Sequence, residues 1–250
     1  MTGRVHLVGG GWGGDGSAWA GFLSDAADRA GGGTPLILIL AVRDLDGPQH
    51  VSKLAQSLRA AGPLDVVAHP VQPGEALPAD LFEREVHGLL VGGGLTPAYL
   101  DVLRPHAGRI RRLVADGMPY AGFSAGSAIA AERALVGGWL HEGLPVVAEE
   151  ASEGLGELSV RNGLGLVPFS VDVHAAQWGT LARMATAVEA GLVEWGVAID
   201  EDSALIVHDE QEHVEGAGNA WWVEPVSDGV VVRRETGRGE PRHRPVQRRR

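Results

Sequence analysis

The chain has 250 residues, of which 44% are apolar, and this is enough to bury the core of one domain. Its formal net charge of −11 argues against a nucleic-acid-binding core, because phosphate contacts need a basic face. It contains no cysteine, which excludes disulfides, thiolate metal sites and a cysteine nucleophile.

The end of the chain differs in composition from the rest. Residues 233–250 hold eight Arg against two Glu, so we expect a disordered Arg-rich tail after one α/β domain over residues 1–232. No apolar run reaches the roughly 18 residues of a membrane helix, and the first residues lack the pattern of a secretion signal. We therefore expect a soluble, cytoplasmic protein that contacts no membrane; a homodimer stays open.

A predicted strand, 4–8, runs into a glycine-rich segment that precedes a predicted helix, 17–29. In that segment Gly9, Gly11 and Gly14 satisfy G-x-G-x-x-G, a pattern typical of dinucleotide-binding loops. A loose turn gives the same pattern in a chain with 37 Gly. We favour the turn and expect no cofactor, with the nucleotide site as the alternative.

Strand and helix patterns alternate from there to residue 116. Residues 35–42 are almost wholly apolar, as in a central strand of a parallel sheet. The alternation predicts an α/β fold with a doubly wound, mostly parallel sheet and helices on both faces. The other elements predicted in this stretch are helix 49–61, strand 64–69, strand 86–91 and helix 98–116.

Ser124 lies on a predicted turn between a short buried strand, bracketed by Pro119 and Gly122, and a helix, 127–133. Gly122 and Gly126 flank it at G-x-S-x-G spacing, where the missing Cβ atoms permit strained dihedrals and close approach of a substrate. The pattern predicts a nucleophilic serine. The alternative is a serine that caps a helix behind a glycine-rich turn.

Beyond the serine, residues 136–157 are irregular, and we expect surface strands or a flap whose glutamates form a solvated face. Strand 170–173 then ends at His174. The remaining predicted elements are helix 177–190, strands 196–201 and 204–208, and a closing hairpin over 221–226 and 229–233.

Chemically useful groups follow four of the predicted strands, and ligands bind at the carboxyl ends of strands in open α/β sheets. A serine hydroxyl needs a base within hydrogen-bond reach, and His174 has the imidazole for that role. A carboxylate must then orient the ring. We choose Glu201, with Asp200 and Asp172 as alternatives.

Backbone N–H groups complete this predicted site. The N–H of Ala125, together with that of Gly93 or Gly94 in the glycine run 92–94, would form an oxyanion hole. His208 and His213 lie among acids, but their spacing matches no defined metal site, so we expect a solvated turn and no metal.

The chain resembles the cyanophycinase and aspartyl dipeptidase (peptidase E) family of serine peptidases, whose fold is flavodoxin-like and similar to class I glutamine amidotransferases. The resemblance implies that Ser124, His174 and Glu201 match the catalytic positions of the cyanophycinase branch. It also implies cleavage of peptide or isopeptide bonds at aspartyl residues. It rests on the first-strand glycines, residues 91–94, 122–128, 163–174 and 197–205.

The substrate-binding positions depart from the family pattern. Where cyanophycinase-like members carry Arg-Gly-Arg after the histidine, this chain has Trp178, Gly179 and Thr180, and only the later Arg183 remains. Leu95 replaces a family Asn or Gln. We expect Leu95, Trp178 and Arg183 at the substrate, with the loss of bidentate arginines changing what is bound.

The sequence thus predicts a serine hydrolase that cleaves a peptide or amide bond of a small substrate through an acyl-enzyme on Ser124. Two alternatives stay open. An α/β-hydrolase esterase would place its acid before its histidine, with His208 as the nearest candidate. A non-catalytic binding protein would keep the fold alone.

Overall fold

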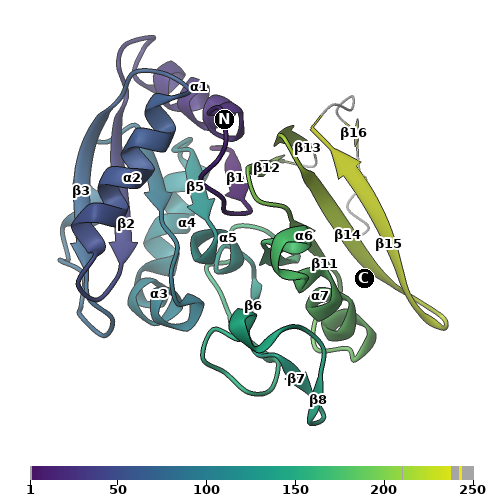
Figure 1. Ribbon diagram of the computed structural model, residues 1–250. Helices are drawn as coiled ribbons and strands as arrows, with labels where there is room; N and C mark the ends of the chain where they lie inside the picture. The colour runs from purple at the N-terminus through teal and green to yellow at the C-terminus, as the bar shows by residue number, and fades with distance from the viewer. Residues whose placement is uncertain (1, 210, 238–241, 244–250) are drawn as a thin grey trace.

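A computed structural model describes residues 2–209, 211–237 and 242–243 (Figure 1). Its largest sheet has the strand order β16-β13-β12-β1-β5-β4-β2-β3, in which β1, β5, β4, β2 and β3 run parallel. The other three strands extend this parallel core in antiparallel fashion. The strands are β1 Val5–Val8, β2 Leu36–Val42, β3 Asp65–Val71, β4 Gly88–Val91, β5 Tyr120–Phe123, β12 Ser203–His208, β13 Gln211–Gly216 and β16 Arg242–His243.

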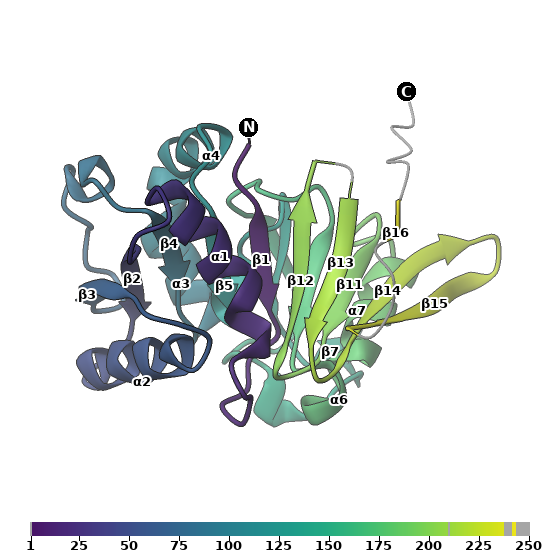
Figure 2. The same cartoon turned by 90° about the horizontal axis from the view of Figure 1, so that it is seen from above.

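Helices cover both faces of the parallel strands, and Figure 2 shows α2 and α4 on opposite sides. Side chains alternate along β2: Ile37 and Ile39 pack with α1 and α2, whereas Leu38 and Leu40 pack with α3 and α4. A strand that is buried on both faces explains the apolar run. The longer helices are α1 Ala20–Arg29, α2 Gly47–Arg59, α3 Thr96–Leu103, α4 Ala107–Ala115 and α7 Thr180–Glu189, with 3-10 turns at Ser17–Trp19, Leu81–Glu83, Arg104–His106 and Glu149–Ala151.

A second sheet carries the later part of the chain, with the order β10-β11-β14-β15. Its strands are β10 Ser170–Val173, β11 Gly196–Ile199, β14 Asn219–Val226 and β15 Gly229–Thr236. In β11, Val197 and Ile199 join the core shared with the first sheet, while Ala198 packs with α7. The predicted α/β class is confirmed. The strands are, however, divided between two sheets, because β10 and β11, which precede His174 and Glu201, pair with each other and not with the first sheet.

The segment between the serine and β10 forms short strands. The helix expected over 127–133 is wrong beyond one turn, α5 Ala125–Ala128. Residues 129–132 instead exchange backbone hydrogen bonds with residues 163–167, which competes with helix formation. The strands here are β6 Arg133–Gly137, β7 Leu140–His141, β8 Leu144–Pro145 and β9 Ser159–Asn162.

Two predicted helices are interrupted. Helix 98–116 is broken by a 3-10 turn that contains Pro105, and helix 177–190 divides at Gly179, whose φ is 72°. The short helix before that glycine is α6 Ala175–Trp178. Within the described residues, no helix is long and apolar enough to cross a membrane.

The expected start of the Arg-rich tail needs correction. Residues 233–236 complete β15, where Arg233 pairs with Trp222 of β14 in register and its guanidinium binds Glu224 (2.7 Å). Strand alternation from residue 229 therefore continues past the expected boundary. Residues 242–243 form β16, and residues 238–241 and 244–250 of the proposed tail lie outside the described residues.

The buried strand β2 gives a direct test of the core. Replacing the fully buried Leu40 with Ala is expected to lower the free energy of unfolding by about 2–5 kcal/mol, because it leaves a cavity between the sheet and α3. Leu45→Ala is the matched control, since Leu45 is 89% exposed and its loss should change stability by under about 0.5 kcal/mol. Urea unfolding followed by circular dichroism measures both; equal losses would contradict this account of the core.

Candidate active site

Ser124 lies on a strained turn between β5 and α5. Its φ of 53° and ψ of −111° are unfavourable for a non-glycine residue and cost of order 1–3 kcal/mol. The backbone holds this conformation: the Ser124 N–H donates to the Val8 carbonyl oxygen (3.0 Å), and the Ser124 carbonyl accepts from Ser127 (2.8 Å) and Ala128 (3.1 Å). The hydroxyl is thereby fixed at the carboxyl end of β5.

Both glycines of the G-x-S-x-G pattern are needed for close backbone approach. A Cβ on Gly122 would lie 2.5 Å from the carbonyl carbon of Gly126, and a Cβ on Gly126 would lie 2.2 Å from the Val91 carbonyl oxygen. Backbone atoms cannot give way at such distances. The pattern therefore has a structural cause in the packing of β4 against the turn.

His174 follows β10 and faces the serine. Its Nε2 lies 2.8 Å from Ser124 Oγ, and its Nδ1 lies 2.7 Å from Glu201 Oε1. A carboxylate at Nδ1 keeps the proton on that nitrogen, which leaves Nε2 as the acceptor for the serine proton. The structure thus brings together the three residues that the sequence singles out as nucleophile, base and acid.

Burial sets the charge of this histidine. It lowers the pKa of His174 below the ordinary value of 6.5, and it outweighs the hydrogen bond and the negative charge of Glu201, which raise the pKa. The imidazole is consequently neutral at pH 7. This is the form that can accept a proton from Ser124.

Asp200, an alternative triad acid, is committed to other partners. It is buried, and it accepts N–H bonds from Ala176 (3.1 Å), from the Asn219 backbone and side chain (3.0 and 2.7 Å) and from the Trp221 indole (3.0 Å). These donors tie α6 and β14 to the turn that follows β11. The carboxylate on the His174 ring is that of Glu201.

Asp172 and Arg183 form a buried ion pair away from the histidine nitrogens. The Arg183 guanidinium donates two hydrogen bonds to the Asp172 carboxylate (2.7 and 2.8 Å) and reaches the carbonyl oxygens of Gly138 (3.4 Å) and Ala151. Arg183 is only 3% exposed and does not line the pocket. Its expected contact with substrate is therefore corrected: it holds the segment between β6 and β9.

The glycine-rich loop after β1 joins the two sheets. The Gly9 carbonyl accepts the His174 N–H (3.0 Å), and the Gly10 carbonyl accepts the Asp202 N–H (2.8 Å). A Cβ on Gly10 would lie 2.1 Å from His174 Cε1, and one on Gly11 would lie 2.6 Å from Asp202 Oδ1. The glycines thus let the loop pack closely against His174 and Asp202, which favours the expected turn over a dinucleotide loop.

The expected oxyanion donors lie beside the serine, but one of them is already bound. A Cβ on Gly93 would lie 3.0 Å from Ser124 Cβ, yet the Gly93 N–H donates to His50 Nε2 (3.2 Å). Burial lowers the pKa of His50 to about 4, so this ring is a neutral acceptor at pH 7. Across the described part of the chain, the N–H groups of Gly94 and Ala125 have no hydrogen-bond acceptor.

A pocket of about 660 Å³ opens over Ser124, His174 and Glu201. Leu95 and Trp178 line it, as the sequence predicts, and both are substantially exposed (53% and 44%). Basic groups from the end of β2 and from α2 face acidic groups from the segment after β8. The charged residues of the pocket besides the triad are Arg43, Asp46, Lys53, Glu150 and Glu153.

The segment expected to form a flap does border the pocket through residues 150–154. Its glutamates are not all solvated, which corrects one expectation. Glu153 Oε2 accepts the Thr96 N–H at the start of α3 (2.9 Å), and burial raises the pKa of this carboxyl. Glu153 and Arg183 thus fasten the flap to the body of the fold.

Sequence reasoning misses His50 and Trp12 of this pocket, and also its two cations, Arg43 and Lys53. Nothing in the pattern of α2 distinguishes His50. Trp12 gives a usable signal, because a large aromatic side chain in a glycine-rich loop at a strand end faces the site; its ring lies against Phe123 (4.6 Å between centroids) and under Lys53 Nζ (4.0 Å).

His208 and His213 lie apart from this site. Each faces an acid, Asp209 (3.8 Å) and Glu215 (3.4 Å) respectively. Among the described residues, no group of three or more His, Cys, Asp or Glu side chains is placed to hold a metal ion. The esterase alternative, which needs His208 at the serine, is not supported, because His208 faces Asp209 and the ring at Ser124 is that of His174.

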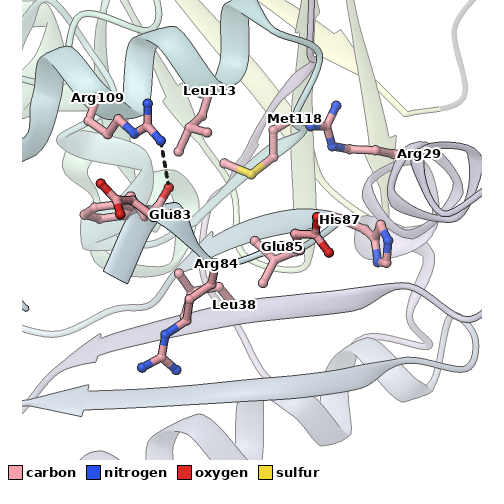
Figure 3. Close-up of a pocket in the computed structure, with 11 residues that line it drawn as sticks. Arg29, Leu38, Glu83, Arg84, Glu85, His87, Arg109, Leu113 and Met118 are labelled. Carbon is pink, nitrogen blue, oxygen red and sulfur yellow. Dashed lines mark hydrogen bonds between the residues drawn. The ribbon is translucent and has the colours of Figure 1, made fainter. Parts of the chain in front are cut away.

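A second hollow, of about 420 Å³, lies at the opposite ends of the parallel strands (Figure 3). Arg109, Arg84 and Glu83 are among its charged side chains, and all three are exposed. Arg109 donates to the Phe82 carbonyl oxygen (3.4 Å). This hollow thus carries acidic and basic side chains at the amino ends of the strands, and it shares no lining residue with the Ser124 pocket.

Comparison with known proteins decides the family. The model of peptidase family S51 matches residues 49–214, about two thirds of the chain. The chain belongs to peptidase family S51. A Listeria monocytogenes EGD-e protein assigned as a peptidase E has a similar fold, with a TM-score of 0.58 over 87% of this chain and 100% of that one at 14% identity. No curated protein matches the chain.

The S51 membership confirms the resemblance to the cyanophycinase and peptidase E family, and with it the expectation of a peptidase. The match spans Ser124, His174 and Glu201. The structural similarity at 14% identity supports the fold alone. The residues that act in this member are therefore argued from its own geometry.

Close packing at Gly10 generates a prediction about the site. Gly10→Ala is expected to push the His174 ring away and lengthen the separation of Ser124 Oγ and His174 Nε2 beyond hydrogen-bond range, because the new Cβ would overlap Cε1 and because φ at Gly10 is 105°. A crystal structure of the variant measures the separation. Gly13→Ala is the control, since its nearest neighbour would be the Asp202 carboxylate at 3.3 Å. An unchanged ring position in Gly10→Ala would show that this contact is not limiting.

Proposed function

We propose that this S51 member hydrolyses a peptide or isopeptide bond through an acyl-enzyme on Ser124. The observation that carries the proposal is the linear set of contacts from Ser124 Oγ to His174 Nε2 (2.8 Å) and from His174 Nδ1 to Glu201 (2.7 Å). A weak nucleophile beside a neutral base that is oriented by a carboxylate is the arrangement that acyl transfer requires.

Both halves of the reaction, acylation and deacylation, follow from these contacts. His174 Nε2 takes the Ser124 proton as Oγ attacks the carbonyl carbon of the substrate, and Glu201 stabilises the resulting imidazolium. Collapse of the tetrahedral intermediate breaks the C–N bond, and His174 gives the proton to the leaving amine. Water then attacks the acyl-enzyme by the same route and releases the acid.

The negative charge of the intermediate needs donors next to Oγ. The N–H groups of Ala125 and Gly94 support this role. Ala125 follows Ser124 directly, and Gly94 belongs to the glycine run that lies beside Ser124. Neither N–H has an acceptor among the described residues. Each such donor is typically worth about 3–4 kcal/mol of transition-state stabilisation. The Gly93 N–H would take part only after leaving His50.

The pocket favours a small, polar substrate. Its volume of about 660 Å³ suits a short peptide, and Arg43 and Lys53 provide cations on its lining. Arg43 is shared with Asp46, to which it donates from Nε (2.9 Å), whereas Lys53 Nζ lies over the Trp12 ring (4.0 Å) without a carboxylate partner among the described residues. We infer from this that a substrate carboxylate, including that of an aspartyl residue, would bind on the α2 side.

A fluorophosphonate probe tests the nucleophile. Wild-type protein is expected to gain one adduct on Ser124, while Ser124→Ala gains none and His174→Gln labels far more slowly, since the hydroxyl then has no base. Ser152→Ala is the matched control: Ser152 also lines the pocket, but no histidine contacts it in the described structure. Intact-mass spectrometry and peptide mapping give the result. Equal labelling of Ser124→Ala would exclude the proposed nucleophile, and lack of dipeptide turnover with saturable ligand binding would favour the binding-protein alternative.

The pH dependence tests the base. Because burial lowers the pKa of His174, kcat/KM is expected to be constant around neutral pH and to fall about tenfold per pH unit below a pKa that lies under 6.5. Glu201→Gln removes a group that raises this pKa, so the acid limb should move to lower pH, and the plateau should fall by roughly 10³–10⁴-fold. An acid limb above pH 7, or one that Glu201→Gln leaves in place, would contradict these assignments.

A further inference from the structure

The indole of Trp178 lies flat on the imidazole of His174, with centroids 3.8 Å apart and planes inclined by 10°. One helical turn creates this stack. The backbone N–H of Trp178 donates to the backbone carbonyl oxygen of His174 (2.8 Å), and Gly179 ends the turn in a left-handed conformation. Residues four apart lie on the same face of a turn, so the spacing of His, Trp and Gly brings the rings together locally.

Other groups surround the edge of the imidazole. Ser124 lies at Nε2, Glu201 lies at Nδ1, and the Gly10 backbone lies against Cε1. The same turn also holds the acid, because Gln177 Oε1 accepts the Glu201 N–H (3.0 Å). Trp178 adds the one aromatic face that stacks on this ring within the described structure.

Burial does not account for Trp178. It is 44% exposed and borders the pocket, and no other aromatic ring is recorded against it among the described residues. The other tryptophans that stack do so in apolar groups, such as Trp195 with Trp222 (5.6 Å). Beyond the helical turn that holds its backbone, the aromatic contact of Trp178 is therefore the imidazole itself.

We propose that Trp178 is a positioning residue for the general base, a role that rests on the hydrolytic function proposed above. The indole fixes the plane of the His174 ring, so that Nε2 faces Ser124 while Nδ1 faces Glu201. Its π face also stabilises the imidazolium that forms when the serine proton is taken, because the face of an aromatic ring attracts a cation.

The sign of the effect on His174 can be worked out from its surroundings. Glu201 on the β11–β12 turn and Asp172 of β10 raise the pKa of His174, whereas burial and Arg183 of α7 lower it. The acids Glu150 and Glu153 lie across the pocket, and Asp200 and Asp202 flank Glu201. An aromatic face adds to the groups that favour the imidazolium, so its loss lowers the pKa as long as the ring stays covered.

Two substitutions distinguish the effect of the aromatic face of Trp178 from the effect of merely covering the His174 ring with an apolar side chain. Trp178→Leu keeps an apolar cover without a π face, and we expect it to lower kcat by roughly 2- to 30-fold and to move the acid limb of the pH profile to lower pH. Trp178→Phe restores an aromatic face and should recover most of both effects. A merely structural role would lower the rates of both variants without moving the pH profile.

Fluorescence tests the contact without any substrate. An imidazolium stacked on an indole quenches its emission, so the difference between wild-type and Trp178→Phe spectra should titrate with the pKa of His174. This transition should vanish in His174→Gln and persist in Ser124→Ala. Subtraction of the two spectra cancels the emission of Trp12, whose neighbour His50 has a pKa that burial lowers to about 4.

The two assays keep the proposals distinct. If Ser124 fails to react with the fluorophosphonate while the His174-dependent transition remains, the hydrolytic function is wrong and the stack is real. A Trp178→Leu profile that matches the wild type, or a Trp178 emission that does not depend on His174, would overturn the positioning role.

Discussion

The hydrogen bond between Ser124 and His174 is the interaction on which the site depends, because its two partners belong to different sheets. Ser124 follows β5 of the large sheet, while His174 and Glu201 follow β10 and β11 of the small one. The carbonyls of Gly9 and Gly10 join the sheets by accepting N–H groups from the loops of the second. The glycine-rich loop thus aligns Ser124 with His174.

Three of the non-glycine residues with positive φ lie at this junction. Ser124, His174 and Asp202 are non-glycine residues with positive φ (53°, 57° and 54°), and each lies in a loop that directs a side chain toward the site or holds the glycine-rich loop. Such conformations persist only when the surrounding structure determines them. Here the parallel strands, buried on both faces, give the rigid frame that keeps these loops in place.

Much of the site is readable from the sequence, because its local signals are strong. The G-x-S-x-G pattern marks Ser124, and a histidine and an acid at the ends of later strands mark His174 and Glu201. Three carboxylates at similar strand ends look alike in the sequence. Only the donors that surround Asp200 and the guanidinium on Asp172 show which acid is left for the imidazole.

The errors come from contacts between distant segments. Helix formation after Ser124 fails because residues 163–167 pair with residues 129–132, and no local propensity reports that competition. The sequence leads us to expect that Arg183 binds substrate. Its partners, Asp172 and the carbonyls of Gly138 and Ala151, lie in separate elements that the sequence does not connect. The division into two sheets is likewise invisible to strand patterns, which show burial and not pairing.

The chain therefore belongs to the S51 family, and its pocket has features of its own. Trp178 stacks on the imidazole of His174, and Arg43 and Lys53 line the same pocket. Beside them, Ser124, His174 and Glu201 stay aligned through their two hydrogen bonds.

Trapping the covalent intermediate tests the central claim most directly. Protein quenched in acid during turnover of p-nitrophenyl acetate should carry one acetyl group, mapped by tandem mass spectrometry to Ser124, and His174→Gln should carry almost none. Acetyl groups found only on lysines or on another serine, or equal acetylation of Ser124 without the imidazole, would contradict the proposal that His174 activates this hydroxyl.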